Sequence, residues 1–390
     1  MPDHRTRLRI GVAVHGRFHA FELALGLLQN GHEVTLFTNY PRAVAARFGV
    51  PAERVRSLVS HGVAARLGNR MAGGQADRWL NPWFGGWAAH NLAREALDLV
   101  HIWSGVAGEW LGHAAARQSR NVLARGSAHI RTQRRLLDEE EARVGVPLHK
   151  PSDWTIEREE QEYESADLIV VPSRFAYETF LHEGVAAERL RRVVLAGAAS
   201  RFQASPAVVQ ARTERIERGQ PLRVLFVGAV SYQKGMFDLL QVMESLPAAR
   251  FHFRLVGTLT AECAARRPRL AERAELIGRV PESELPAHYA WADLHVLPSI
   301  QDGFAVVLSQ AAASGVPFIA SAHSGGPDLV DAGVPGWILP ARAPAQWAAL
   351  LCALDEDRAQ LATRARATAG AAQSRDWRAV AHDLIGAVAP

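Results

Sequence analysis

Short apolar runs alternate with amphipathic segments along most of this chain. In the first half the apolar runs fall at 7–14, 33–38, 99–103, 121–124 and 168–172, and segments with helical periodicity lie between them. A strand, a helix and a further strand in this order form a right-handed parallel unit. The pattern therefore predicts an α/β domain built on a doubly wound parallel sheet.

The alternation stops between residues 197 and 220 and then begins again. The new apolar runs fall at 223–228, 251–257, 274–278, 293–298 and 317–321. We therefore expect two Rossmann-like domains with a boundary near residue 200. Parallel sheets of this kind bind ligands at the carboxyl ends of their strands, so the two domains should face a central cleft.

Composition narrows the class of protein. The chain has 390 residues, of which 48% are hydrophobic, and this is typical of a folded protein. We find no run of the roughly 18 apolar residues that a membrane-spanning helix needs, and no signal-peptide pattern at the start. Two cysteines are too few for a disulfide framework or a cysteine-rich zinc site. We expect a cytoplasmic protein.

Positive charge is concentrated in one segment. The net charge is only +4, because 44 basic residues face 40 acidic ones, and this small excess does not predict binding to nucleic acid. Residues 42–78 nevertheless hold only two acidic residues and seven arginines, which are Arg42, Arg47, Arg54, Arg56, Arg66, Arg70 and Arg78. A solvated helix face is the simpler interpretation. Peripheral contact with an anionic membrane surface is the alternative.

Three tryptophans, Trp79, Trp83 and Trp87, recur every four residues at the end of this segment. Pro82 and the pair at 85–86, both glycine, argue against a regular helix here. Burial against the first domain is the simpler interpretation of the tryptophans. A sugar-stacking or membrane-facing surface near the cleft is the alternative.

Two loops that follow strands carry candidate anion-binding residues. Gly16 follows the first strand, where a glycine lets backbone amides and a helix N-terminus approach an anion. A plain tight turn is the alternative interpretation of this glycine. The G-x-G-x-x-G fingerprint is absent, which counts against a nicotinamide enzyme. In VGAVSYQKGMFDLL (227–240) a strand ends at Gly228, and Lys234 stands where the next helix begins. A lysine beside a helix N-terminus can neutralise a diphosphate.

The segment LPSIQDGFAVVLSQAAASGVPFIAS (297–321) has the most specific pattern. A strand is followed by Asp302, Gly303 and Phe304, and an Ala-x-Gly-x-Pro-x-Ile strand comes later. Together with the lysine–glycine helix start at 234–235, this segment resembles the second domain of the family 4 glycosyltransferases, which have the GT-B fold. Gln310 lies eight residues after Asp302, about two helical turns along, so it can meet a ribose while the loop meets a sugar.

The chain departs from this family's pattern at three positions. The first carboxylate is Asp302 where the family usually has glutamate, the second carboxylate position is Gln310, and Ala229 stands where many members have arginine. A glutamine amide still donates to and accepts from ribose hydroxyls. Lys234, helped by Ser231, would then hold the diphosphate with less positive charge than usual.

Other segments extend the resemblance. The segment 274–299 looks like the family's nucleobase side, which would place Gly278, Arg279 and Val280 near the base. The tail at 376–388 resembles the terminal helix that crosses back to the first domain. In the first domain, NVLARGSAHIRTQ (121–133) offers Arg125 and His129 as rivals for the group that faces the donor sugar. His129 as a helix-capping histidine is the alternative.

Two acidic segments are candidates for metal sites. Residues 138–164 are acidic with a helical pattern, which Pro147 and Pro151 interrupt, and we interpret them as a solvated surface. The Asp-Glu-Asp triplet at 355–357 matches the D-x-D of metal-dependent glycosyltransferases only superficially, because it falls between helices of the tail. No metal site is predicted.

The resemblance implies a retaining, metal-independent glycosyltransferase that moves a hexosyl group. Residues 201–375 would bind a UDP- or GDP-linked sugar, residues 1–200 a glycan or lipid-linked acceptor, and residues 376–390 would cross back to the first domain. No cofactor is implied beyond this substrate, and bacterial surface-polysaccharide or glycoconjugate assembly is the expected setting. The alternatives are a GT-B nucleotide-sugar epimerase and a catalytically weak sugar-nucleotide-binding protein at the inner face of the membrane.

Overall fold

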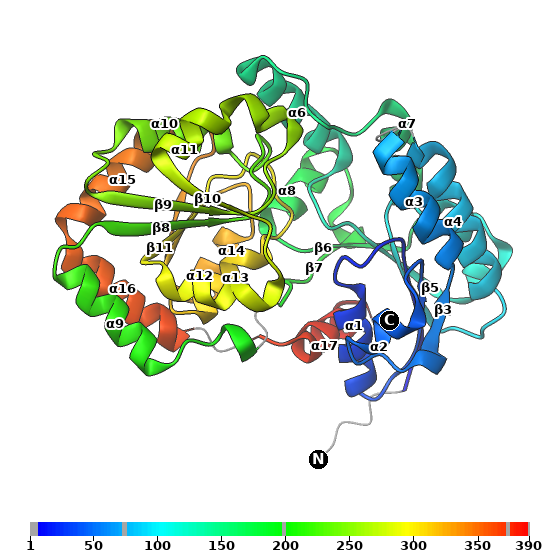
Figure 1. The fold of residues 1–390 in the computed structure, drawn as a ribbon. Helices are drawn as coiled ribbons and strands as arrows, with labels where there is room; N and C mark the ends of the chain where they lie inside the picture. Colours follow the sequence, from blue (N-terminus) through cyan, green and yellow to red (C-terminus); the bar gives the residue numbers. More distant parts are fainter. Residues whose placement is uncertain (1–6, 72–75, 197–199, 372–374, 389–390) are drawn as a thin grey trace.

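The protein has two α/β halves, each built on a parallel sheet (Figure 1). The computed structural model describes residues 7–71, 76–196, 200–371 and 375–388. The predicted α/β class with two Rossmann-like parallel sheets is confirmed. None of the described helices is both long and apolar enough to cross a bilayer.

The first sheet has seven strands in the order β3-β2-β1-β4-β5-β6-β7, and the second has six in the order β10-β9-β8-β11-β12-β13. The strands of the first sheet are β1 (Arg9–Val14), β2 (Glu33–Thr38), β3 (Val55–Ser57), β4 (Leu99–Trp103), β5 (Arg120–Ala124), β6 (Leu168–Val171) and β7 (Leu190–Arg192). Those of the second are β8 (Leu222–Val227), β9 (Phe251–Val256), β10 (Ala274–Gly278), β11 (Leu294–Leu297), β12 (Phe318–Ser321) and β13 (Gly336–Leu339). The sequence pattern missed β3, β7 and β13. These three are edge strands of three or four residues, too short to show a period.

Helices fill the connections between the strands. In the first half they are α1 (Ala20–Gln29), α2 (Arg42–Ala46), α3 (Val59–Met71), α4 (Asp77–Leu92), α5 (Gly108–Leu111), α6 (Ile130–Val144), α7 (Asp153–Ser165) and α8 (Arg174–His182). In the second half they are α9 (Pro206–Glu217), α10 (Met236–Ser245), α11 (Arg267–Arg273), α12 (Leu285–Trp291), α13 (Val306–Ala313), α14 (Gly326–Asp331), α15 (Pro344–Glu356) and α16 (Arg358–Ala371), and α17 (Trp377–Val388) follows. Serine side chains cap the N-termini of α7, α8 and α9 by accepting from backbone amides.

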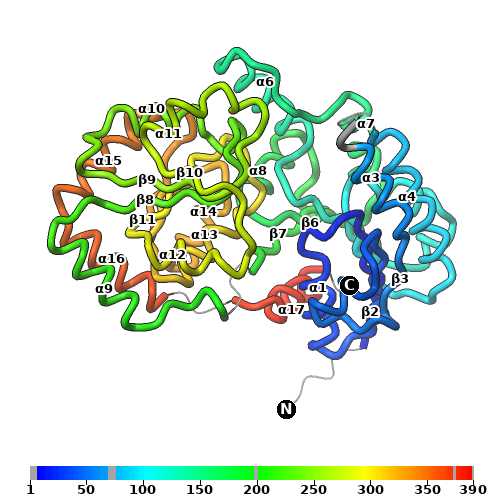
Figure 2. Tube along the Cα trace, in the orientation of Figure 1, coloured from blue at the N-terminus to red at the C-terminus, as the bar shows by residue number. Residues whose placement is uncertain are grey.

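The last helix, α17, packs on the first. Figures 1 and 2 show α17 (red) beside α1 (blue), away from the second sheet. The approach is so close that a Cβ at Gly26 would overlap the backbone of Trp377. Val380 and Leu384 of α17 are buried in the same core cluster as Phe21 of α1.

Helix α4 is regular, so the prediction that Pro82 and the glycine pair would prevent a helix is wrong. The helix runs from Asp77 to Leu92 with Pro82 inside it. Buried Phe84 and Leu92 hold it against the first domain, and this packing outweighs the lost backbone hydrogen bond. Gly85 lies so close to α5 that a Cβ there would displace the carboxylate of Glu109.

The tryptophans of α4 are not equally buried. Trp79 is 76% exposed and Trp83 43% exposed, whereas Trp87 is partly buried and contacts Phe37 and Phe84. The predicted burial is therefore wrong for the first two and right for the third. Four-residue spacing kept the side chains near one side of the helix, but only Trp87 lies over the core.

The acidic segment 138–164 is not simply a solvated surface. Glu140, Glu159 and Glu162 are buried, and each pairs with an arginine. Glu140 also pairs with Arg342 of the second domain, at 3.0 Å. The end of α6 therefore lies on the second domain, where Val144 joins that domain's core. Charge pattern alone did not reveal this, because Arg125 and Arg342, which pair with Glu159 and Glu140, come from outside the segment.

Candidate functional site

Three glycines bring the loops of the second sheet together at its carboxyl edge. Gly228 ends β8 with φ of +148°, and its amide donates to the Val256 carbonyl at 2.9 Å. A Cβ at Gly257, which follows β9, would overlap the Gly228 carbonyl. A Cβ at Gly235 would likewise overlap the Pro298 carbonyl after β11. The loop between β8 and α10 is thus held directly against the ends of β9 and β11.

Lys234 and Asp302 form an ion pair at this edge. Lys234 closes the loop before α10, and Asp302 lies in the loop between β11 and α13. Their side chains are only 24% and 12% exposed, so the pair is partly shielded from water. Ser231 is buried, and its hydroxyl oxygen accepts from the Lys234 amide at 3.3 Å. The lysine and the acid that the sequence singled out therefore lie together.

The loop between β11 and α13 reaches across to the first domain. A Cβ at Gly303 would overlap the carbonyl of Gly126, which follows β5. Beside this contact the Ser127 hydroxyl donates to the side-chain oxygen of Gln301 at 2.7 Å. Phe304 is buried at the same place. No side chain caps the start of α13 at Ala305, two residues after Gly303.

Gln310 lies on α13 and is almost fully buried. Its side-chain oxygen accepts from the Tyr289 hydroxyl at 3.1 Å. Burial raises the pKa of Tyr289 well above its usual value, so this phenol stays a hydrogen-bond donor. Val280 packs at the edge of the same apolar cluster. The residue that we expect at the ribose is thus anchored by a tyrosine that sequence reasoning missed.

The other residues that we expect near the nucleobase lie at the end of β10 and directly after it. Gly278 has φ of +82°, and its carbonyl accepts from the Gly257 amide at 2.8 Å. Arg279 is exposed at this edge. Gly278, Arg279 and Val280 therefore lie beside the glycine loops of β8 and β9, at the same sheet edge as Lys234.

In the first domain Arg125 and His129 have different surroundings. Arg125 is tied to its own domain by Glu159, Gln133 and the Ala128 carbonyl, and it lines two cavities at the domain interface. His129 caps α6, accepting from the Arg131 amide at 3.3 Å. Its buried ring packs on Tyr163 and Phe180, and burial lowers its pKa to about 4. The structure thus gives His129 the capping contact that was the alternative to facing the sugar.

Gly16 follows β1 with φ of +102°, as a tight turn requires. Its amide donates to the side-chain oxygen of Asn39 at 2.8 Å. This amide is therefore engaged within the first domain. The prediction that Gly16 lets an anion approach has no support from this hydrogen bond.

A polar pocket of about 420 Å³ lies between the domains. From the first domain it is lined by Asp77 at the start of α4, by His149 and Lys150 before α7, and by Arg125. Gln233, the neighbour of Lys234, lines it from the second domain. Burial raises the pKa of Asp77. Sequence reasoning missed this pocket, although Lys150 is one of only two lysines in the chain.

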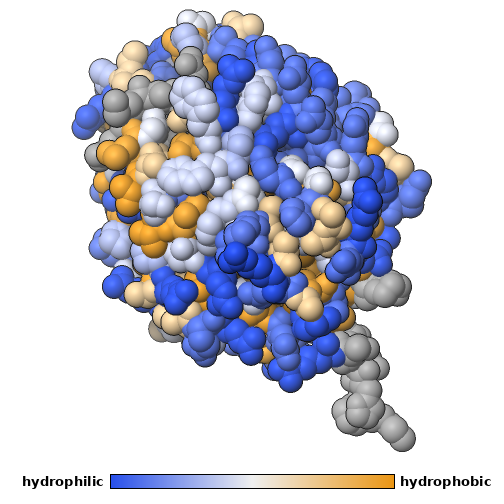
Figure 3. Space-filling view, turned by 90° about the vertical axis from the view of Figure 1, so that its right-hand side faces the viewer, coloured by the Kyte–Doolittle hydropathy of each residue, from blue (hydrophilic) through white to orange (hydrophobic). Residues whose placement is uncertain are grey.

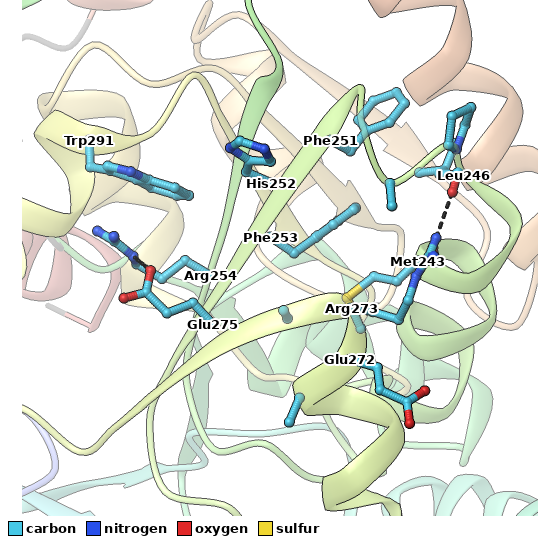
Figure 4. Close-up of a pocket in the computed structure, with 14 residues that line it drawn as sticks. Met243, Leu246, Phe251, His252, Phe253, Arg254, Glu272, Arg273, Glu275 and Trp291 are labelled. Carbon is cyan, nitrogen blue, oxygen red and sulfur yellow. Dashed lines mark hydrogen bonds and ion pairs between the residues drawn. The ribbon is translucent and has the colours of Figure 1, made fainter.

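A different groove, of about 510 Å³, lies at the amino ends of β9 and β10 (Figure 4). In it the Arg254 guanidinium lies 3.9 Å from the centre of the Trp291 ring and pairs with Glu275 at 2.7 Å. Parallel sheets bind ligands at their carboxyl ends, so this groove is not part of the site.

No group of three or more metal-binding side chains occurs among the described residues, and Asp355 of the acidic triplet pairs with Arg250 and Arg358.

Two family models match this chain, one on each domain. Residues 17–194 match the model described as "Glycosyltransferase Family 4", and residues 221–357 match "Glycosyl transferases group 1". Together they cover both sheets except β1, and they include the loops with Lys234 and Asp302. The chain belongs to the family 4 glycosyltransferases of the GT-B fold.

Curated relatives match part of the chain. The putative colanic acid biosynthesis glycosyltransferase WcaL of Salmonella typhimurium is 32% identical over 164 residues, 38% of this chain and 40% of the relative. The amylovoran biosynthesis glycosyltransferase AmsK of Erwinia amylovora is 29% identical over 154 residues, 36% of this chain and 38% of the relative. The matched segments thus span about two fifths of these proteins.

Solved structures match nearly the whole chain in fold. Anabaena Alr3699/HepE in complex with UDP has a TM-score of 0.68 at 16% identity and covers 97% of this chain and 99% of that one. Sucrose-phosphate synthase from Thermosynechococcus elongatus has a TM-score of 0.69 at 20% identity, with 97% of each chain covered. At these identities the likeness concerns the fold.

Proposed function

We propose that this protein transfers a hexosyl group from a UDP- or GDP-linked sugar to a hydroxyl of a glycan or lipid-linked acceptor, with retention at the anomeric carbon. One observation carries the proposal. Lys234 and Asp302 pair at the carboxyl edge of the second sheet, and Gly303 brings that edge onto Gly126 of the first domain. A nucleotide, its diphosphate and the sugar would occupy this edge in that order.

The donor would be held mainly by charge and by amide groups. A diphosphate would compete with Asp302 for Lys234, and the carboxylate that is released could accept from sugar hydroxyls. The uncapped start of α13 adds a positive dipole beside the phosphates. Gln310, fixed by Tyr289, would present its amide to the ribose. These contacts stabilise the charge that develops on the leaving diphosphate.

The chemical step needs no protein nucleophile in this proposal. The bond between the anomeric carbon and the diphosphate oxygen breaks, and the acceptor oxygen bonds to that carbon on the same face. The acceptor proton passes to the departing phosphate oxygen. Catalysis then depends on orientation in the closed cleft and on charge stabilisation at Lys234. No metal ion or cofactor beyond the donor is proposed.

The acceptor would enter through the polar pocket of Asp77, His149 and Lys150, because Gln233 joins that pocket to Lys234. The relatives WcaL and AmsK are named for colanic acid and amylovoran biosynthesis. We therefore propose a role in bacterial surface-polysaccharide or glycoconjugate assembly, at the cytoplasmic face of the membrane.

The test starts from the donor. A panel of UDP- and GDP-sugars should contain one that raises the melting temperature, because a ligand of the folded state stabilises it by mass action. With that donor, release of the nucleoside diphosphate should depend on Lys234, and Lys234→Ala should slow it steeply. Arg267→Ala, at an exposed arginine of α11, is the matched control.

Other outcomes would favour the alternatives. An epimerase would convert the donor sugar in the absence of any acceptor and would form no transfer product. A donor that binds but is never turned over, with any acceptor, would indicate a sugar-nucleotide-binding protein. Failure of every donor to bind would overturn the proposal.

A further inference from the structure

A small apolar cavity lies on the cleft side of the first domain. Its volume is about 130 Å³. Side chains from β4, β5 and β6 line it together with side chains from α1 and α17, and Phe304 lines it from the second domain. Most of these side chains are aliphatic or aromatic. Arg125 is the one lining residue that this cavity shares with the polar pocket of Lys150.

The outer face of the first domain has a different character. Figure 3 shows that face, on which hydrophilic residues predominate and hydrophobic residues form smaller groups. Hydrophobic residues scattered over a surface are normal in folded proteins. A cavity of this size between packed elements is not, because protein interiors are packed as closely as organic crystals. The cavity is therefore a candidate site for an apolar ligand.

A histidine without a hydrogen-bond partner lines the cavity. His101 of β4 is only 3% exposed, and its Nδ1 accepts from and donates to no described residue. Burial lowers the pKa of His101 to about 4, so the imidazole is neutral near pH 7. A buried polar nitrogen without a partner is costly, and a hydroxyl group beside it would remove that cost.

Water matches this cavity poorly. A buried water molecule makes about three hydrogen bonds. Besides His101, the side chains with hydrogen-bonding groups in the lining are those of His19 and Arg125. Arg125 already bonds to groups of its own domain, and the His19 ring stacks on Trp377 with 5.4 Å between the ring centres. An apolar cavity of about 150 Å³ stays dry and binds benzene, so an aromatic ring is of suitable size here.

A strained aromatic residue stands at the mouth of the cavity. Phe18, in the loop between β1 and α1, lines the cavity and is also 56% exposed. Its φ is +41°, a conformation that residues other than glycine adopt at a cost. Backbone strain of this kind clusters at ligand clamps and active sites. Because the side chain both lines the cavity and meets solvent, it marks where a ligand would enter.

The cavity also borders the loop that carries Asp302. Phe304 follows two residues after Asp302, and its buried side chain lines the cavity. The same ring lies so close to the loop before α14 that a Cβ at Gly325 would overlap it. An occupant of the cavity would therefore contact the donor loop through a ring that has little room to move.

We propose that this cavity binds an apolar group of about the size of a benzene ring that carries one hydroxyl, and that the hydroxyl bonds to His101. The binding does not rest on the proposed function. The source of the group does, because the group is either the apolar end of the acceptor or a separate small molecule that acts on the donor loop.

Phenol and toluene test the site, because they have nearly the same shape and differ in one hydroxyl. Titrations of the full chain, followed by saturation-transfer NMR, should show that both bind. His101→Phe keeps a ring and removes its nitrogens, so it should weaken phenol binding about fivefold to tenfold and leave toluene binding nearly unchanged. His252→Phe, at an exposed histidine of β9, is the matched control and should bind both like the wild type.

Ala124→Leu tests the cavity without touching His101. Ala124 ends β5 and lines the cavity, so a leucine there would fill part of its volume. Both probes should then lose binding, while the melting temperature should stay equal or rise, because filling a cavity stabilises a fold. The proposal is overturned if the wild type binds neither probe, if folded Ala124→Leu binds both as before, or if His101→Phe affects phenol no more than toluene.

Transfer kinetics with an active donor distinguish the two sources of the group. If phenol raises the KM of the acceptor and leaves kcat unchanged, the cavity holds the apolar end of the acceptor. If phenol changes kcat or the KM of the donor, and Ala124→Leu removes the effect, the cavity serves a separate small molecule. Phenol binding that changes none of these quantities would overturn the link to the donor loop.

The site and the proposed function fail in different ways. Lys234→Ala should still bind phenol, because Lys234 does not line the cavity. Phenol binding without turnover of any donor would reject the transferase and keep the site. Donor turnover in a protein that binds neither probe would keep the transferase and reject the site.

Discussion

The backbone of Gly303 lies directly against the carbonyl of Gly126, so the two domains meet at the cleft with no side chain between them. Ile300, three residues earlier, packs with Ala128 and Phe175 of the first domain in a small apolar cluster. The loop that carries Asp302 is therefore positioned by both domains. Any change in this contact should alter the geometry of the donor site.

Gly303→Ala should reduce transfer strongly. The added Cβ overlaps the Gly126 carbonyl, so the loop or the whole domain must shift, and a shift of about 1 Å costs roughly a hundredfold in rate. The measurement is kcat with a saturating donor. Gly126→Ala is the control, because a Cβ there meets no described atom within 4 Å and should be tolerated. Full activity of Gly303→Ala would show that the contact is unimportant.

Lys234→Ala should lower kcat/KM by about 30-fold to 1000-fold. The lysine would stabilise charge on the leaving diphosphate, and removing one such contact costs about 2–4 kcal/mol. Asp302 would also lose its ion-pair partner. Steady-state kinetics of the variant against Arg267→Ala provides the comparison. An unchanged turnover number would remove Lys234 from the mechanism.

Gln310→Leu should weaken donor binding by about 1–3 kcal/mol, because the ribose hydroxyls lose their partner. The loss should appear in the donor's KM more than in kcat, since a ribose contact serves ground state and transition state alike. Gln310→Glu should be tolerated, because a carboxylate still accepts from Tyr289. In Gln310→Leu the Tyr289 hydroxyl can donate instead to the Val307 carbonyl, 3.2 Å away, so it is not left unpaired.

Tyr289→Phe is the control for Gln310→Leu. It removes the hydroxyl that holds Gln310 and leaves the amide in place. Donor affinity should then change less than in Gln310→Leu. Equal donor affinity of the wild type and the leucine variant would place the ribose contact elsewhere.

His295 should make the fold less stable in acid. It is fully buried on β11, and neither ring nitrogen has a hydrogen-bond partner among the described residues. Burial lowers its pKa to about 3, whereas the unfolded chain has the ordinary value near 6.5. As pH falls below 6.5 the unfolded state takes up a proton that the folded state does not. The free energy of unfolding should therefore fall by up to about 1.4 kcal/mol per pH unit until pH approaches 3.

His295→Leu should remove this part of the acid dependence. The substitution buries no unpaired nitrogen and has a similar volume, so stability at neutral pH should stay equal or rise. Urea unfolding between pH 7 and pH 4 gives the slope. His252→Leu, on the exposed side of β9, is the control. Identical slopes for the wild type and His295→Leu would contradict the prediction.

Transfer should persist in EDTA. In the proposed mechanism the positive charge at the diphosphate comes from Lys234 and from the start of α13. The assay compares product formation before and after chelation. Complete loss that magnesium or manganese restores would contradict this prediction.

The sequence alone predicted both sheets and the loops of the second domain that carry the candidate site. The strands β9 to β12 fell within their apolar runs and β8 began one residue before its run, because hydrophobic periodicity is a local signal. The short edge strands β3, β7 and β13 carry too few residues for such a signal. Lys234 and Asp302 were both identified from their own loops. A strand that is followed by a loop with a glycine and a charged residue can be recognised from the neighbouring sequence alone.

What joins those loops was decided by tertiary structure. Lys234 and Asp302 pair across 68 positions, and Ser127 meets Gln301 across 174. Burial of Glu162 and exposure of Trp79 likewise depend on which distant elements pack nearby. A local pattern fixes which side of a helix is apolar, but not what covers that side. For this reason the strands and loops could be predicted from the sequence, whereas the ion pair, the interdomain pocket and the exposure of Trp79 could not.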